Sequence, residues 1–402
     1  MRDPEELPKE ETGAAAFISA SNNEHDGRGI IVGVFDTGVD PGAPGLQTTS
    51  AGERKMLDIV DCTGSGDVDT TATATADADG CITGLSGRKL TIPASWPKLA
   101  ADEKYHLGLK AAFELYPRGL AGRIKDKRRK ARIDEAQRDA VAKARADVEG
   151  SKGGADKRVE EERKARLAVL ETLDKEYDDP GPVFDVVTYH GADGVWRVCV
   201  ETAETGDLAA ARLLCPFRLD PNAYAPLDAE TLLNYTVDVT ADGGRTTICV
   251  DAGSHGTHVA GIIGAHFAET PELNGVAPGV QIIGFKIGDT RLGSMETGAA
   301  LVRALGAAIE RKVDVINLSY GEYASVDNCG RFTKMCELAV YKYGIVFVTS
   351  AGNNGPALTT GGAPGTSACC IPIGAPCCIP IGGPCCIPIG GPCCIPMPVG
   401  IT

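Results

Sequence analysis

The sequence has few aromatic residues, no long apolar run and no excess of positive charge, and each absence excludes a class of protein. Phe, Trp and Tyr make up 5% of the 402 residues. No apolar stretch approaches the ~18 residues of a membrane span, and the charged N-terminus lacks the apolar core of a secretory signal peptide. A net charge of −14 opposes binding to nucleic acid or to an anionic membrane. We therefore expect a cytoplasmic protein with neither kind of partner.

The cysteines are numerous but unevenly placed. Eight of the 15 form four adjacent pairs between Cys369 and Cys394, inside an eight-residue Cys-Cys-Ile-Pro repeat, and the other seven are scattered. Scattered thiols in a chain without a signal peptide indicate reduced cysteines. Adjacent cysteines lack the gap that lets two thiolates bind one tetrahedral ion, so we expect no metal at the repeat. We also expect no cofactor. The regular prolines of the repeat predict that it cannot add a strand to a sheet.

A highly charged segment lies in the first half of the chain. Between Arg118 and Asp179, 33 of 62 residues are Asp, Glu, Lys or Arg, and their balance is 18 − 15, or +3. This pattern predicts solvated helices on an insertion. The alternative is an arm that binds nucleic acid or a protein partner.

Short apolar runs elsewhere alternate with helical patterns. The predicted strands are residues 30–35, 280–286, 313–319 and 345–350, and the predicted helices are residues 295–311 and 331–343. Apolar strands that alternate with helices indicate an α/β fold with a parallel sheet covered on both faces. Functional residues in such a fold belong at the carboxyl ends of the strands.

Three polar motifs follow or face these strand ends. Asp36 begins an Asp-Thr-Gly turn directly after the first strand, where an orienting carboxylate belongs. The alternative is that Asp36 only forms the turn. An aspartic peptidase would need two such motifs, and the chain has one. His255 begins a helical run of small residues that lacks the zincin spacing, and His258 suits a core or supporting role. Asn353 follows the strand 345–350, with a turn role as the alternative.

Together these motifs resemble the subtilisin-like serine peptidases, which order their triad Asp, His, Ser and use an Asn as oxyanion donor. The 218 residues between Asp36 and His255 resemble the insertion of the tripeptidyl-peptidase II family. The resemblance covers roughly residues 10–365 and includes Asp58–Asp69, Gly84–Arg88 and Ile92–Trp96. It implies a subtilisin-like fold, interrupted by a large mixed insertion and incomplete at its C-terminus.

The resemblance also implies roles for single residues. Asp36 orients the imidazole, His255 is the general base and Asn353 binds the oxyanion. Ser319, Tyr320 and Gly321 line a groove that pairs with an extended peptide. Glu296 and Glu322 bind the substrate ammonium, the alternative being ordinary solvated carboxylates. The implied activity is release of tripeptides from free peptide N-termini, in a family that forms large homo-oligomers.

The expected domains follow from the same resemblance. Residues 1–48 begin the catalytic domain, 49–235 form the insertion with its charged helical segment, 236–365 continue the catalytic domain, and 366–402 are the repeat, outside the fold.

The nucleophile is expected to be missing. The family's Gly-Thr-Ser segment lies roughly 90 residues beyond the oxyanion Asn, whereas 49 residues follow Asn353 here. Gly365-Thr366-Ser367 copies the motif, but only 14 residues after Asn353, so we do not expect Ser367 to be the nucleophile. We expect a truncated chain that lacks its nucleophile and its assembly region. Either the repeat is a gene-model error and the true product is a peptidase, or the chain is an inactive peptide-binding or interaction protein.

Overall fold

The computed structural model describes most of the chain between residues 7 and 373. It leaves out residues 1–6, 23, 137, 151–155, 177–178, 229–230, 324–325, 327, 353–360 and 374–402. In the part that it describes, no helix is long and apolar enough to cross a membrane.

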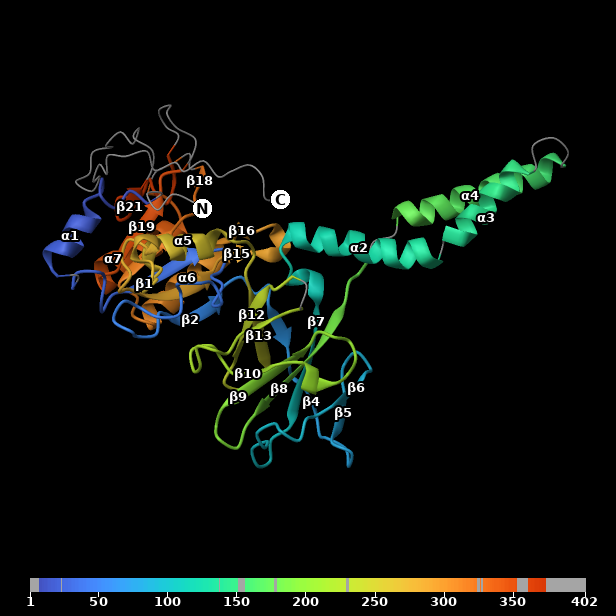
Figure 1. Cartoon of the computed structure of the whole chain (residues 1–402), viewed down its shortest axis with the longest axis horizontal. Coiled ribbons are helices and arrows are strands. Elements are labelled where there is room, and N and C mark those ends of the chain that lie inside the picture. The colour runs from blue at the N-terminus through green and yellow to red at the C-terminus, as the bar shows by residue number, and fades with distance from the viewer. Residues whose placement is uncertain are drawn as a thin grey trace.

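A six-stranded parallel sheet forms the centre of the larger body (Figure 1). Its strands are, in spatial order, β2 (Met56–Asp61), β14 (Gln281–Lys286), β1 (Ile31–Asp36), β17 (Val315–Leu318), β19 (Val346–Ser350) and β21 (Ile371–Ile373). All neighbours are parallel. The four strands expected from their apolar runs are therefore confirmed.

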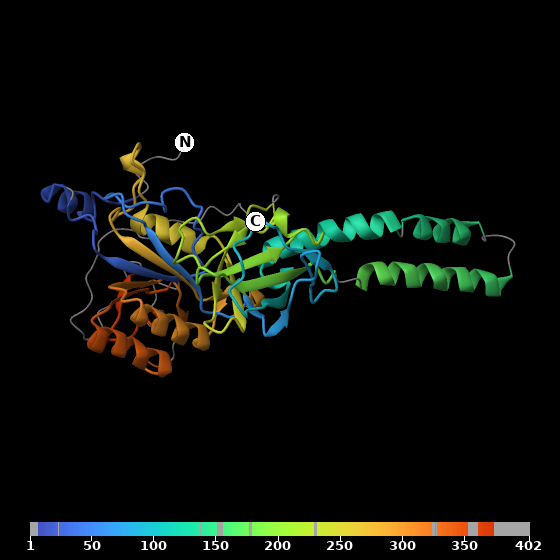
Figure 2. The same cartoon turned by 90° about the horizontal axis from the view of Figure 1, so that it is seen from below.

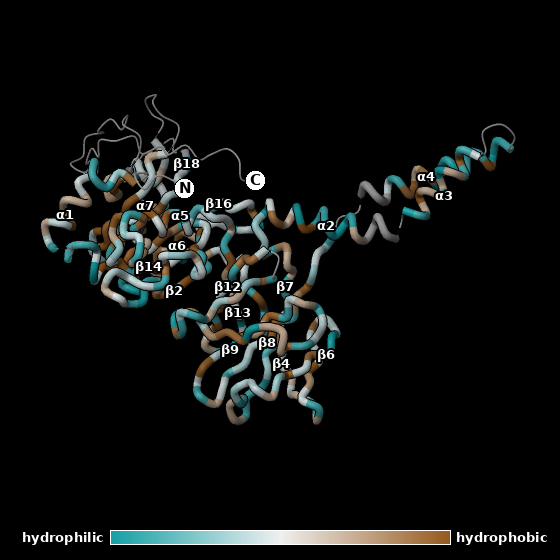
Figure 3. Tube along the Cα trace, viewed as in Figure 1, coloured by the Kyte–Doolittle hydropathy of each residue, from teal (hydrophilic) through white to brown (hydrophobic). Residues whose placement is uncertain are grey.

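Helices cover both faces of this sheet. They are α5 (His255–Gly264) on one face, and α6 (Gly298–Glu310) and α7 (Arg331–Tyr343) on the other. Side chains of β1 alternate between the faces: Val32 and Val34 pack in the α5 core, and Phe35 packs in the α6 and α7 core. Figure 3 shows hydrophobic residues gathered inside this body. The α/β fold with both faces covered is confirmed.

A second body of antiparallel strands lies between β2 and α5 in the sequence. One sheet contains β11 (Ala225–Pro226), β12 (Asn234–Val239), β13 (Arg245–Val250) and β3 (Asp67–Asp69). The other contains β10 (Leu213–Leu214), β9 (Trp196–Glu201), β8 (Val183–His190), β7 (Tyr105–Ala111) and β4 (Ala72–Ala74). Because β13 ends five residues before His255, this second body leads directly into the helix of the expected catalytic histidine.

Smaller elements complete the fold. They are α1 (Ala14–Ala20), the strand pairs β5 (Cys81–Thr83) with β6 (Lys89–Thr91), β15 (Gly288–Asp289) with β16 (Met295–Glu296) and β18 (Glu322–Tyr323) with β20 (Gly362–Ala363), and the 3₁₀ turns η2 (Ala112–Glu114), η3 (Leu208–Ala210), η4 (Pro271–Leu273) and η5 (Thr290–Leu292).

The charged segment forms an arm that projects from both bodies (Figures 1 and 2). Helices α2 (Arg118–Ala136) and α3 (Arg138–Glu149) lead outward, and α4 (Lys157–Glu176) returns beside them. Ala144 is the buried residue of α3, so the arm has little core of its own.

Two features differ from the expected organisation. The expected insertion begins at residue 49, yet β2 lies beyond that boundary and belongs to the six-stranded sheet. The prediction that the repeat cannot add to the sheet is wrong for its first unit, because β21 pairs with β19. Pro372 fits there because only one side of an edge strand carries ladder hydrogen bonds.

Candidate active site

The expected site residues converge at the carboxyl edge of the parallel sheet. Asp36 is the last residue of β1, and Ser319 and Ser350 stand at the ends of the next two strands, β17 and β19. Neighbouring parallel strands end at the same edge, so these residues lie together although they are far apart in the sequence.

Asp36 and His255 form a hydrogen-bonded pair. Nδ1 of the imidazole lies 2.8 Å from Oδ1 and 2.9 Å from Oδ2 of the carboxylate. Asp36 is fully buried, whereas the side chain of His255 is 42% exposed, so the ring stands between the protein interior and solvent. The hydrogen bond to Asp36 raises the pKa of His255, against an opposing effect of burial. Because the carboxylate holds Nδ1, the other ring nitrogen, Nε2, is available for proton transfer.

Thr37 and Gly256 fix the position of the pair. The Thr37 hydroxyl donates to the Gly253 carbonyl at 2.7 Å and accepts from the Gly256 amide at 3.0 Å. A Cβ atom on Gly256 would lie 2.1 Å from the Gly38 carbonyl oxygen and 2.9 Å from the Asp36 Cβ. The helix of His255 therefore packs directly on the turn of Asp36, and a side chain at residue 256 would separate them.

An open pocket of about 420 Å³ lies beside His255. It is lined by His255, Ser319, Tyr320, Gly321, Glu322, Ser350, Gly352 and Gly362. The Tyr320 ring meets the His255 ring edge-on, with 6.5 Å between centroids. The residues expected to line a peptide groove thus surround one cavity with the histidine.

The two expected amine-binding carboxylates lie on separate two-stranded ribbons near this pocket. Glu296 in β16 is opposite Gly288, and Glu322 in β18 is opposite Ala363. Partial burial raises the pKa of Glu296, and the negative charge of Glu322 raises it further. The charge of one carboxylate thus disfavours ionisation of the other, which favours a cation between them.

The sequence analysis also considered Asn353, as the oxyanion donor, and Ser367, which it did not expect to be the nucleophile. Asn353 lies outside the described residues. Ser367 is buried, its hydroxyl is 3.5 Å from that of Thr333 in α7, and it is not among the pocket-lining residues. In the described part of the chain, the hydrogen bonds of the His255 ring both go to Asp36.

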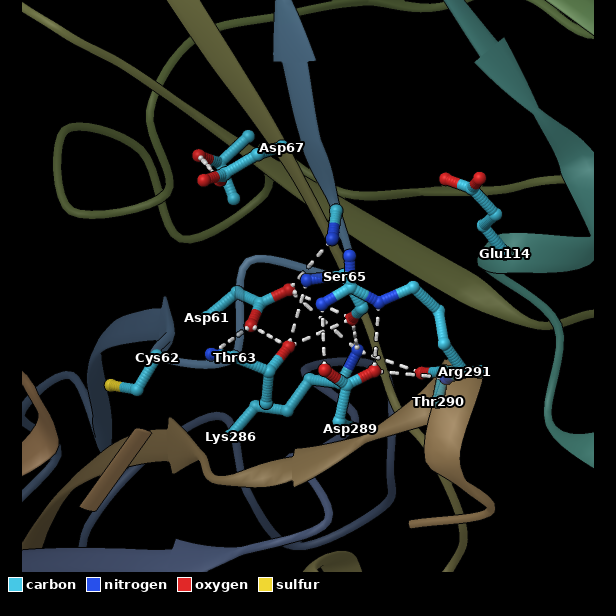
Figure 4. A network of polar contacts seen from close by, with 12 residues as sticks. Asp61, Cys62, Thr63, Ser65, Asp67, Glu114, Lys286, Asp289, Thr290 and Arg291 are labelled. Carbon is cyan, nitrogen blue, oxygen red and sulfur yellow. Dashed lines mark hydrogen bonds and ion pairs between the residues drawn. The ribbon is translucent and has the colours of Figure 1, made fainter. Parts of the chain in front are cut away.

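A buried ion pair supports the same sheet edge, and the sequence analysis missed it. Lys286 and Asp61 are both fully buried, with Nζ and Oδ2 3.6 Å apart. The ammonium also donates to Ser65 and Thr290, at 2.8 and 2.9 Å (Figure 4). Burial alone would raise the pKa of Asp61, but Lys286 and hydrogen bonds from Thr63 hold it below its usual value. A lysine at the end of an apolar strand was the available sequence signal.

Asp251 is a second residue that the sequence analysis missed. It follows β13 and accepts a hydrogen bond from Thr257 at 3.3 Å. Burial, with the negative charge of Asp40, raises its pKa to about 8. Among the described residues, no group of three or more His, Cys, Asp or Glu side chains is placed to hold a metal ion.

Comparisons with known proteins identify the family and the fold to which this chain is similar. A sequence profile of the Subtilase family matches residues 27–376. The chain is 45% identical to a tripeptidyl-peptidase 2 from Oryza sativa subsp. japonica and 42% identical to one from Caenorhabditis elegans, in both cases over 92% of its own length. A crystal structure of tripeptidyl peptidase 2 superposes with a TM-score of 0.72 at 32% identity, over 91% of this chain and 29% of that one. The chain spans 28% and 27% of the two curated relatives.

Proposed function

The chain belongs to the subtilase family, and from that premise we propose that it provides the Asp–His pair and the substrate groove of a serine-type tripeptidyl aminopeptidase. The proposed reaction releases tripeptides from free peptide N-termini. The two tripeptidyl-peptidase 2 relatives support this choice within the family. We also propose a cytoplasmic location, which is supported by nine free cysteines in the described part of the chain.

The observation that carries the proposal is the position of the Asp36–His255 pair at the pocket that Glu322 also lines. Nε2 of His255 would accept the proton of a serine nucleophile, and Asp36 would stabilise the imidazolium that forms. Among the described residues, no serine hydroxyl is hydrogen-bonded to the His255 ring. The residues Ser319–Gly321 pair with the extended substrate through main-chain hydrogen bonds. Glu296 and Glu322 hold the substrate ammonium, and Asn353 donates to the oxyanion.

A second function is peptide binding without hydrolysis. It is favoured by the position of Ser367, whose hydroxyl is buried beside Thr333 and away from the pocket of His255. The groove and the amine-binding carboxylates would serve such a protein as they serve an enzyme.

One pair of peptides tests both functions. The chain is incubated with an alanine-rich heptapeptide that has a free N-terminus and, in parallel, with its N-acetylated form. Binding is measured by calorimetry and product release by mass spectrometry. Release of the N-terminal tripeptide from the free form alone supports the peptidase, and binding of the free form without release supports the second function. Failure to prefer the free form in either measurement contradicts both.

A further inference from the structure

Ser294 contacts both halves of the proposed site. Its hydroxyl donates to the carbonyl of Ala252 at 2.8 Å, three residues before His255. Its own carbonyl accepts from the Tyr320 hydroxyl at 3.1 Å. Two residues after Ser294 comes Glu296, on the β15–β16 ribbon. A single serine thus connects the histidine loop, the groove edge and an amine-binding carboxylate.

The opposite side of the histidine loop is attached to Asp36. The Ala252 amide donates to the carbonyl of Thr37 at 2.8 Å, and Thr37 follows Asp36 directly. Ala252 is itself 4% exposed. The loop is therefore held on one side by the turn of Asp36 and on the other by the hydroxyl of Ser294.

The backbone at Ser294 adopts an unusual conformation. Its φ angle is +70°, directly after Gly293 at +68°. This left-handed conformation is unfavourable for a non-glycine residue. The Ser294 amide donates to the Asp289 carbonyl at 2.9 Å, which fixes the turn from within its own ribbon. With this backbone conformation, the hydroxyl of Ser294 reaches Ala252 and the carbonyl of Ser294 reaches Tyr320.

We propose that Ser294 is a positioning residue that couples the amine-binding carboxylate Glu296 to the loop of His255. A peptide ammonium bound at Glu296 orders the β15–β16 ribbon, and the hydroxyl of Ser294 transmits that order to Ala252 and the following histidine. This inference rests on the proposed function for its ligand. The connection itself exists in the free protein and can be measured there.

The ligand-free test compares Ser294→Ala with a matched hydroxyl deletion, Ser254→Ala. Ser254 is exposed, and its side chain makes no capping hydrogen bond. Hydrogen exchange is followed at the amides of Ala252 and Gly256, with Ile283 in the central strand β14 as the reference for global opening. Loss of one hydrogen bond, worth about 1 kcal/mol, predicts roughly fivefold faster exchange at the two loop amides in Ser294→Ala. Rates that match those of the wild-type chain overturn the proposal.

The ligand-bound test uses the free-amine heptapeptide at saturation, with its N-acetylated form as the control. The proposal predicts that the free peptide slows exchange at Ala252 and Gly256 in the wild-type chain. In Ser294→Ala the peptide still binds, but the slowing is lost. Equal slowing in both proteins overturns the coupling. Absence of binding to the wild-type chain contradicts the amine site itself, and the ligand-free exchange rates then decide whether Ser294 holds the loop.

Discussion

Both carboxylate oxygens of Asp36 lie within hydrogen-bond distance of Nδ1 of His255, at 2.8 and 2.9 Å. This contact raises the pKa of the histidine. A folded pKa above the unfolded value of about 6.5 means that the protonated imidazole stabilises the fold fully below that pH. The contribution is lost as the pH rises through the folded pKa.

Asp36→Asn should therefore lower the pKa of His255, because the acceptor charge disappears. It should also remove this histidine's contribution to the fall in unfolding free energy as the pH rises above about 6.5. NMR titration of the imidazole protons and urea unfolding at several pH values measure the two effects. An unchanged pKa at His255 would show that the contact does not govern its protonation.

Gly256 and Gly261 lie in the same helix and should respond oppositely to alanine. A Cβ at residue 256 would lie 2.1 Å from the Gly38 carbonyl oxygen, whereas one at residue 261 has nothing within 4 Å. Gly256→Ala should lower the unfolding free energy by about 1–3 kcal/mol through overpacking. Gly261→Ala should raise it by roughly 0.5–1 kcal/mol, since alanine favours helix. Chemical unfolding of both variants measures the difference, and equal effects would contradict the close packing at residue 256.

Much of this site could be predicted from the sequence because local patterns produce it. The apolar runs predicted β1, β14, β17 and β19, and the parallel sheet then required that Asp36 and Ser319 meet at one edge. The small residues after His255 predicted a helix that begins at the histidine, as α5 does.

Other features depend on contacts between distant segments, and local patterns do not show them. Lys286 is buried with Asp61, which lies 225 residues earlier. A lysine at the end of an apolar strand indicates a buried cation, but no local pattern identifies Asp61 as its partner. The link from Ser294 to Ala252 joins two loops that are 42 residues apart in the sequence. β21 was missed for a different reason: proline spacing excludes a central strand but not an edge strand.

Each member of the buried Lys286–Asp61 pair should be needed for the stability of the fold while the other remains charged. Lys286→Met leaves the Asp61 carboxylate without its cation and should lower the unfolding free energy by about 3–5 kcal/mol. The double variant with Asp61→Asn removes both charges and should recover much of that loss. Urea unfolding of the single and double variants measures this.

The pH dependence of the pair provides an independent check. The pKa of Asp61 is depressed in the fold, so its contribution is present above the unfolded value of about 3.9 and is lost as the pH falls through the folded value. The wild-type chain should therefore lose stability on acidification below about pH 4 more than the double variant does. Parallel acid-unfolding curves would contradict the assignment.

Glu296 should make peptide binding depend on pH. Burial and the charge of Glu322 raise its pKa, so it gains a proton at a higher pH than an ordinary glutamate. Protonation removes its attraction for the ammonium, and affinity for the free-amine peptide should fall as the pH falls through that pKa. Glu296→Gln should weaken binding by roughly tenfold at pH 7, the loss expected for a charge-assisted hydrogen bond, and should flatten this pH dependence.

Glu310→Gln is the matched control for the Glu296 variant, because it removes an exposed carboxylate at the end of α6. It should leave both the affinity and the pH dependence unchanged. Calorimetric titrations with the free-amine and acetylated peptides between pH 4.5 and 7.5 measure these effects. If Glu310→Gln and Glu296→Gln weaken binding equally, the attraction comes from the overall negative charge of the chain. If only Glu296→Gln does so, the carboxylate acts at short range on the substrate ammonium, as a clamp at the end of the groove requires.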